Sequence, residues 1–328
     1  MMRAFGERTD VLKPNHTSRV PLGQRNGSVI ESSVMRIGAK VPNSGPLPER
    51  LGIGSMAAEL EAAGFESLWV SDHIVLPTAI GSRYPFADDG RATWPTDTPY
   101  FDALIALALI AQATERAAIG TAVLVLPLRH PVVFAKQAAS IDVASRGRLR
   151  LGVGAGWLEE EFDALNVPFE RRGRRLDEWI SLSRACWTGA PGPFQSELYN
   201  LPPGVLCLPA PAHSIPLLIG GHSPVALRRA GRVGDGWLAQ QAFPALAPDE
   251  LGGPVELMRA AADEAGRDPA SLQVVLRIVE AAGRSTELAL RLQELAAAGV
   301  DEIIIDVSLE NGEAADVCAR LREAAATL

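Results

Sequence analysis

The feature that most constrains this 328-residue chain is a regular alternation of short apolar runs with longer helical patterns, which begins after residue 34. Such alternation is typical of parallel strands joined by crossover helices. Most of the runs are continuously apolar, as expected for strands buried on both faces. The predicted strands are Met35–Val41, Ser67–Ser71, Ala117–Leu126, Leu149–Gly154, Pro216–Ile219, Gly236–Gln240, Leu272–Ile278 and Glu302–Val307.

Proline and glycine mark the ends of the predicted helices. Pro131–Ser145 begins with a proline and is followed by Gly147, and Glu49–Ala63 is followed by Gly64. The other predicted helices are Arg174–Thr188, Pro224–Val233, Ala247–Ala265, Thr286–Ala298 and Ala314–Ala325. This pattern predicts an α/β protein with a single (β/α)8 TIM barrel with loop insertions over residues 34–328. A doubly wound open sheet is the alternative.

Charge and cysteine content exclude several classes of partner. The net charge of −8 argues against nonspecific binding to nucleic acid or to an anionic membrane surface, so a small-molecule partner is expected. Cys186, Cys207 and Cys318 are widely spaced and odd in number, which argues against a disulfide framework and a zinc site. No apolar run is long enough to span a bilayer. We therefore expect a cytoplasmic protein without a metal, in which residues 1–33 form a disordered extension.

Three long connections interrupt the alternation: Ile74–Tyr100, Gly156–Gly173 and Gly189–Ile215. Long loops in compact domains are usually lids or binding loops. The first two follow strands and are expected at the active end of the barrel. The third follows a helix, so it lies at the opposite end unless it folds back.

Two glycine clusters follow predicted strands. Gly152–Gly156 reads G-x-G-x-G and does not match the dinucleotide-binding spacing G-x-G-x-x-G. We interpret these glycines as room for a flat ring; the alternative is a tight turn without a ligand. In the second cluster, the N–H groups of Gly220, Gly221 and Ser223 precede a helix and predict a phosphate site. Ser223 is also a candidate N-cap.

His73 and Asp72 end the second predicted strand, at the end of a barrel where catalytic groups lie. An imidazole exchanges protons readily near neutral pH, so His73 is the candidate for proton transfer. The alternative is a histidine that only bonds neighbouring loops. The acidic run Glu159–Glu161 is interpreted as a solvated helix face, since no metal-ligand spacing accompanies it.

Five ordered motifs give the chain a resemblance to a known family. They are AGFESLWVSDH at Ala63–His73, IGTAVLVLPLRHP at Ile119–Pro131, SRGRLRLGVGAGW at Ser145–Trp157, FERRGRRLDE at Phe169–Glu178, and IGGHSP at Ile219–Pro224 continuing to GDGW at Gly234–Trp237. With these motifs the chain resembles the luciferase-like monooxygenase superfamily and, within it, coenzyme F420-dependent oxidoreductases. The similarity extends from Met35 to Leu328.

The resemblance implies a cofactor ring at the mouth of the barrel, beside Asp72 and His73. It also implies a bulge in the third strand with a non-prolyl cis peptide near Ala122–Val123. The residues assigned to the cofactor are Ala122, Val123, Gly154, Ala155 and Gly156 at the ring, and Gly220, Gly221 and Ser223 at the phosphate.

Trp157 stands where sugar-phosphate dehydrogenases similar to this chain carry a glutamate, which argues against glucose 6-phosphate as substrate. It is expected to form an apolar wall of the substrate pocket, although a tryptophan that only packs is equally ordinary. The resemblance implies F420-dependent hydride transfer to or from a small organic substrate, by a homodimer. The alternatives are a two-component monooxygenase that uses reduced FMN and a cofactor-binding barrel without catalytic activity.

Overall fold

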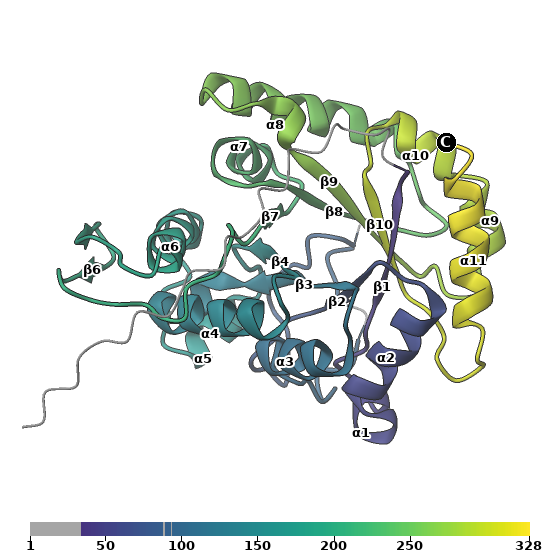
Figure 1. The fold of residues 1–328 in the computed structure, drawn as a ribbon, viewed down its shortest axis with the longest axis horizontal. Coiled ribbons are helices and arrows are strands. Elements are labelled where there is room, and N and C mark those ends of the chain that lie inside the picture. Colours follow the sequence, from purple (N-terminus) through teal and green to yellow (C-terminus); the bar gives the residue numbers. More distant parts are fainter. Residues whose placement is uncertain (1–33, 88, 93) are drawn as a thin grey trace, which may run out of the picture. The chain divides into compact units, whose positions relative to one another are not determined.

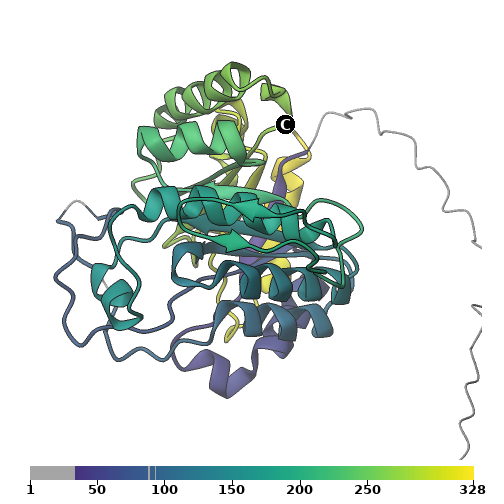
Figure 2. The ribbon, with the colours of Figure 1, turned by 90° about the vertical axis from the view of Figure 1, so that its left-hand side faces the viewer.

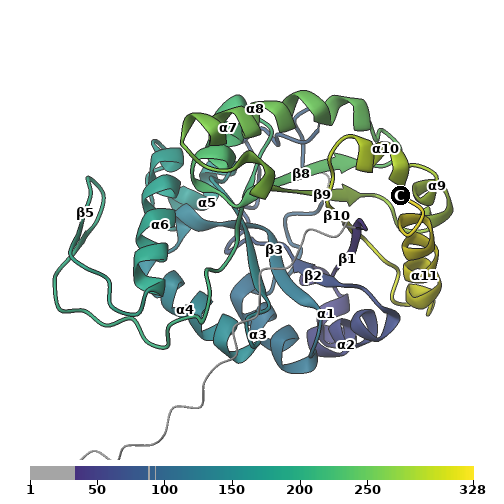
Figure 3. The ribbon, with the colours of Figure 1, turned by 45° about the horizontal axis from the view of Figure 1, so that its top comes forward.

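The computed structural model describes residues 34–328 except 88 and 93, so the prediction for residues 1–33 lies outside the described residues. Eight parallel strands close into a barrel in the order β1-β10-β9-β8-β7-β4-β3-β2, with helices around the outside (Figure 1, Figure 3). This confirms the predicted TIM barrel and excludes the open sheet. The barrel strands are β1 (Arg36–Lys40), β2 (Ser67–Val70), β3 (Ala118–Val125), β4 (Leu149–Gly154), β7 (Leu217–Gly220), β8 (Gly236–Ala242), β9 (Gln273–Val279) and β10 (Glu302–Ile305).

The helices differ from the predicted ranges at identifiable residues. Gly52 has φ 80° and divides the first predicted helix in two. Ala103–Ala113 was not predicted as a helix, because it has no polar residue before Gln112 and therefore no helical periodicity. The described helices are α1 (Leu47–Leu51), α2 (Ile53–Ala63), α3 (Ala103–Ala113), α4 (Pro131–Ala144), α5 (Glu159–Ala164), α6 (Arg172–Trp187), α7 (Pro224–Val233), α8 (Gly252–Glu264), α9 (Ser285–Ala289), α10 (Leu292–Ala297) and α11 (Ala314–Ala325), with 3-10 turns η1 (Leu126–Leu128), η2 (Pro248–Leu251) and η3 (Pro269–Ser271).

The third long connection folds back along α6. It contains the antiparallel strands β5 (Phe194–Gln195) and β6 (Asn200–Leu201), which lie beside α6 in Figure 2. The N–H of Leu198 donates to Glu178 Oε2 at 3.1 Å, and the ring of Tyr199 contacts Trp179. This settles the open alternative: the middle of the connection packs on the first half of α6 rather than staying at the amino-terminal ends of the strands.

The amino-terminal layer of the barrel interior is organised around the buried carboxylate of Glu302. Its Oε1 accepts from Ser67 Oγ at 2.5 Å and from Trp69 Nε1 at 3.2 Å. Its Oε2 lies 2.5 Å from Arg150 Nη1 and 3.1 Å from Arg36 Nη2. One carboxylate thus joins four strands of the closed barrel, β1, β2, β4 and β10.

We predict that Glu302→Ala destabilises the protein by about 3–5 kcal/mol, because Arg150 would keep its charge in the buried layer without a carboxylate partner. Urea unfolding followed by circular dichroism measures the change. Glu310→Ala is the matched control: Glu310 pairs with Arg50 at an exposed position, so its removal is expected to cost about 0–1 kcal/mol. Equal losses for the two variants would contradict the central role of Glu302.

Candidate active site at the mouth of the barrel

The candidate site lies at the carboxyl-terminal ends of the strands. Alternate residues of a strand point into the barrel, and the middle inward layer is apolar, with Trp69, Leu218 and Ile304 among its members. Two positions further along the strands, the next inward layer consists of polar residues and glycines. By this alternation its members are Lys40, Ser71, Gly154, Gly220, Gln240, Arg277 and Asp306. This layer forms the floor of the barrel mouth.

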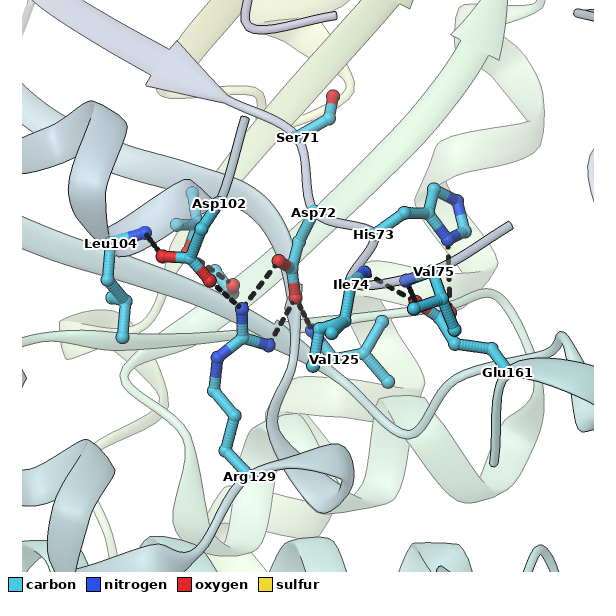
Figure 4. Close-up of polar contacts among 12 residues, drawn as sticks. Ser71, Asp72, His73, Ile74, Val75, Asp102, Leu104, Val125, Arg129 and Glu161 are labelled. Atoms are coloured by element: carbon cyan, nitrogen blue, oxygen red, sulfur yellow. Dashed lines mark hydrogen bonds and ion pairs between the residues drawn. The ribbon is translucent and has the colours of Figure 1, made fainter. Parts of the chain in front are cut away.

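His73 follows β2 and is held by a carboxylate from α5. The His73 Nδ1 lies 3.0 Å from Glu161 Oε2, while Glu161 Oε1 accepts the backbone N–H of Ile74 at 2.6 Å and of Val75 at 3.3 Å (Figure 4). Only 1% of the Glu161 side chain is exposed. The interpretation of Glu159–Glu161 as a solvated helix face is therefore wrong for Glu161, because the fold packs α5 against the segment that follows β2.

Glu160 fixes a later part of the same connection. Its carboxylate accepts the N–H groups of Gly81 and Ser82 and the Ser82 hydroxyl, at 2.5, 2.9 and 2.6 Å. Desolvation opposes ionisation, but these hydrogen bonds and that of its own N–H lower the pKa of Glu160 to about 2. The carboxylate therefore stays ionised near neutral pH and keeps the connection attached to α5.

Asp72 points to the other side of the β2 terminus from His73 (Figure 4). Its Oδ2 and Oδ1 lie 2.6 and 2.7 Å from Arg129 Nη1 and Nη2, and Oδ2 also accepts the N–H of Val125 at 2.9 Å. Arg129 also reaches Asp102, the N-cap of α3. Although desolvation opposes it, Asp72 raises the pKa of Arg129. The sequence places Asp72 beside His73 as a catalytic partner; the structure gives it a buried ion pair that fixes the ends of β2 and β3.

Aromatic side chains surround His73. The ring centroids of Tyr100, Trp94 and Trp157 lie 5.4, 6.2 and 6.3 Å from that of the imidazole. His73 and Tyr100 border a pocket of about 210 Å³. Trp157, expected as an apolar wall, lies in this cluster, and Trp94 and Tyr100 join it from a connection whose sequence has no periodicity to place them.

The non-prolyl cis peptide is confirmed at Ala122–Val123, where the register between β3 and β4 is interrupted. The Val123 side chain lies between two of the predicted cofactor glycines. A Cβ on Gly154 would lie 3.0 Å from a Val123 methyl, and a Cβ on Gly220 would lie 2.7 Å from one. These glycines therefore make room for Val123, a packing role that the sequence did not reveal.

Ala155 and Gly156 lead from β4 into the connection to α5. Gly156 has φ 87°, and a Cβ there would lie 2.7 Å from both Phe162 and Val125. A side chain at this position would thus meet both unfavourable backbone geometry and direct overlap. The turn requires glycine with or without a ligand.

The second glycine cluster leads from β7 into α7. Gly221 has φ 112°, and the Ser223 hydroxyl accepts the N–H of Ala226 at 3.3 Å, which confirms Ser223 as the N-cap of α7. The Gly221 carbonyl accepts from Trp237 Nε1 at 2.8 Å, which fixes the turn. Phosphate binding by Gly220, Gly221 and Ser223 stays a prediction.

Lys40 and Arg277 are site candidates that the sequence analysis missed. Lys40 is 7% exposed, and its Nζ lies 3.1 Å from Asn43 Oδ1 and 3.3 Å from the Val41 carbonyl. Burial, and secondarily the charge of Arg277, lower its pKa from 10.5 to about 7. The available signal was the charge of Lys40 after the apolar run Ile37–Ala39 of the same strand, because a buried charge requires a partner or a ligand.

A larger cavity of about 560 Å³ lies at the amino-terminal ends of the strands and is lined by Arg36, Arg116, Arg150 and others. Barrel enzymes place their chemistry at the opposite end. We therefore assign the candidate site to the smaller pocket beside His73.

Comparison with known proteins places the chain in a family. The luciferase-like monooxygenase family matches residues 41–327. An uncharacterized protein of Mycobacterium tuberculosis is 35% identical over 221 residues, which cover 67% of this chain and 75% of that protein. The F420-dependent glucose-6-phosphate dehydrogenase of Nakamurella multipartita is 32% identical over 219 residues, 66% of this chain and 59% of that enzyme.

Solved structures support the same fold. An F420-dependent secondary alcohol dehydrogenase in complex with an F420-acetone adduct gives a TM-score of 0.71 at 18% identity, over 88% of this chain and 99% of that one. The monooxygenase RslO1 from Streptomyces bottropensis gives 0.66 at 19% identity, over 88% and 98%. Taken with the sequence match, the chain belongs to the luciferase-like monooxygenase family and is an enzyme of the oxidoreductase or monooxygenase type.

Within the described part of the chain, no helix is both long and apolar enough to cross a membrane. The same residues contain no group of three or more His, Cys, Asp or Glu side chains arranged to hold a metal ion.

We predict that the stability difference between wild type and Lys40→Met depends on pH. The folded protein loses the Lys40 proton near pH 7, whereas the unfolded chain keeps it until about pH 10.5, so the contribution of Lys40 to stability improves as pH rises between these values. The unfolding free energy of Lys40→Met minus that of wild type should therefore decrease by up to about 1.4 kcal/mol per pH unit. Urea unfolding at pH 7, 8 and 9 measures it; a constant difference would contradict the lowered pKa.

Proposed function

We propose that this protein is an F420-dependent oxidoreductase that transfers a hydride between the deazaflavin and a small organic substrate, with His73 exchanging the proton. The observation that carries the proposal is the His73–Glu161 contact at the barrel mouth, where His73 borders a pocket and also contacts a cluster of aromatic rings. Two relatives above 30% identity, the glucose-6-phosphate dehydrogenases of Nakamurella multipartita and Amycolatopsis mediterranei, are named as F420-dependent.

The residues at the mouth fit a flat cofactor ring. Gly154 and Gly220 have no side chain, and Val123 is only partly buried between them, so these three residues leave a low, apolar surface next to the cis peptide. Ala122, Val123 and Gly154–Gly156 would hold the ring, and Gly220, Gly221 and Ser223 would meet the phosphate at the start of α7. When bound, a deazaflavin supplies or accepts a hydride, a two-electron step.

Glu161 determines which ring nitrogen of His73 carries the proton. Because Glu161 already accepts two backbone N–H groups through Oε1, its Oε2 acts as the acceptor for His73 Nδ1–H. The Nε2 lone pair of His73 is then free to accept a proton. In the oxidative direction, Nε2 takes the substrate's proton as the hydride leaves its carbon; in the reductive direction the proton returns by the same path.

Asp72 acts in this proposal as a positioning residue rather than as a proton carrier. Its carboxylate is occupied by Arg129 and by the N–H of Val125, which joins the β2 terminus to the end of β3. Trp157 supplies part of the apolar wall that a substrate would meet beside His73. Because Trp157 replaces the glutamate of the sugar-phosphate enzymes, we propose a substrate other than glucose 6-phosphate.

The alternative is a monooxygenase that uses reduced FMN, a possibility supported by the family and by a fold shared with the monooxygenase RslO1. Titration of the purified protein with F420 and with FMN, followed by absorbance, distinguishes them through their dissociation constants. Binding of neither would refute the proposal. Binding of F420 without turnover of any acceptor would favour the non-catalytic barrel. The homodimer and the cytoplasmic location remain predictions, and sedimentation velocity tests the former.

We predict that His73→Ala lowers kcat by about 10²–10⁴-fold while the cofactor dissociation constant changes far less. Glu161→Gln should lower kcat by a smaller factor, since it acts through His73. If the two residues form one unit, the double variant will be no slower than His73→Ala alone. Steady-state kinetics and absorbance titration provide both readouts. Near-normal kcat in His73→Ala would assign the proton to another group or to water.

We predict that Gly221→Asp weakens cofactor binding by about 10-fold or more, because its carboxylate would repel the cofactor phosphate at the start of α7. Gly221 has φ 112°, so Gly221→Asn is the control for backbone strain without charge. Absorbance titration of both folded variants gives their affinities. If the Asp variant binds as tightly as the Asn variant, this turn does not hold the phosphate.

A further inference from the structure

Two cations, the buried Lys40 and the partly buried Arg277, lie in the floor of the barrel mouth without a carboxylate partner. Lys40 Nζ is bonded only to amide and carbonyl oxygens, and Arg277 Nη1 donates to the Ala122 carbonyl at 2.9 Å and to Ser71 Oγ at 3.2 Å. The Nε–H of Arg277 is buried and has no partner. Among the residues that the structure describes, neither cation has an acidic group within 4.0 Å.

This arrangement differs from that of three other arginines with little exposure, whereas the buried Arg175 likewise lacks a carboxylate partner among the described residues and donates to the Pro168 carbonyl. Arg129, Arg150 and Arg229 are each paired with a carboxylate, at 2.6, 2.5 and 2.5 Å. Isolated charges are costly to bury, and a cationic pair adds mutual repulsion. The charge of Asp306, which lies more than 4.0 Å away, partly offsets the positive charge of Lys40. When Lys40 is protonated, two cations and one carboxylate leave one positive charge without a counter-charge in the floor.

The cation pair is connected to the pocket beside His73. Arg277 donates to Ser71, whose hydroxyl interacts with Tyr100, and the Tyr100 ring lies 5.4 Å from that of His73. The same guanidinium contacts the carbonyl of the cis peptide. Arg277 is therefore linked both to the cis peptide, where the ring is proposed to lie, and, through Ser71 and Tyr100, to His73.

We propose that Lys40 and Arg277 form an anion subsite that binds a carboxylate of the substrate, so that the substrate is an organic acid; this rests on the proposed function. One surplus positive charge matches a monoanion better than a dianionic phosphate. The unpartnered Nε–H gives a carboxylate a donor on the guanidinium, and the lysine ammonium adds a point charge. Burial and Arg277 hold the pKa of Lys40 near 7, and a bound anion would favour its protonated form.

The test uses the full chain without cofactor and benzoate as the probe, with neutral benzamide as its isostere. Tryptophan fluorescence reports binding, because Trp94 and Trp157 contact the ring of His73, which borders the pocket. Wild type should bind benzoate at least about 10-fold more tightly than benzamide. Arg277→Gln and Lys40→Met should each reduce that preference about 10-fold or more, with benzamide binding changed less. Arg277→Lys, which keeps the charge, should retain part of it.

Arg116→Gln is the matched control, because Arg116 lines the cavity at the opposite end of the barrel. Loss of the preference in this variant, or no preference in wild type, would overturn the subsite. The wild-type comparison needs no variant to fold. Parallel F420 titration separates the two proposals. If the protein binds F420 but does not prefer benzoate, the subsite alone is refuted. If the preference for benzoate is lost only in the Lys40 and Arg277 variants, the subsite is supported whether or not F420 binds.

Discussion

The closed barrel depends on a buried charge as well as on its strand ladders. Glu302 accepts from Ser67 and Trp69 and pairs with Arg150 and Arg36, so its carboxylate connects strands that are far apart in the sequence. The apolar layer above it then fills the barrel centre. These two layers fill the amino-terminal and central parts of the barrel interior, and the polar floor of the mouth lies above them at the carboxyl-terminal ends of the strands. The chemistry of the mouth is therefore a consequence of how the other layers are filled.

The mouth itself is assembled by carboxylates that hold loops. Glu161 and Glu160 fix the connection after β2, and Asp72 with Arg129 fixes the adjoining end of β3. These acids form hydrogen bonds to backbone and arginine groups, and under the proposed function His73 is the group that exchanges the proton. In the proposed reaction, the same contacts that order the loop also orient the imidazole.

Sequence patterns located much of this architecture. All eight barrel strands lie where continuous apolar runs predicted them, and the cis peptide lies at Ala122–Val123, as the family resemblance implied. The patterns failed where a residue's role depends on a distant segment. Glu161 reads as part of a solvated acidic run, but α5 packs against the segment after β2. The packing of Val123 against Gly220 was likewise not visible in the sequence, and the predicted phosphate contact of Gly220 stays a prediction.

The sequence by itself determined the family, the barrel and the strand end on which His73 lies, because periodicity, glycine and proline signals are local and the family motifs are contiguous. Only the tertiary structure decided that Asp72 binds Arg129, that His73 binds Glu161, and that Lys40 and Arg277 share the floor of the mouth. The physical reason is that a closed parallel barrel brings together the ends of strands separated by tens to hundreds of residues. Lys40 and Arg277 become neighbours only when β10 pairs with both β1 and β9.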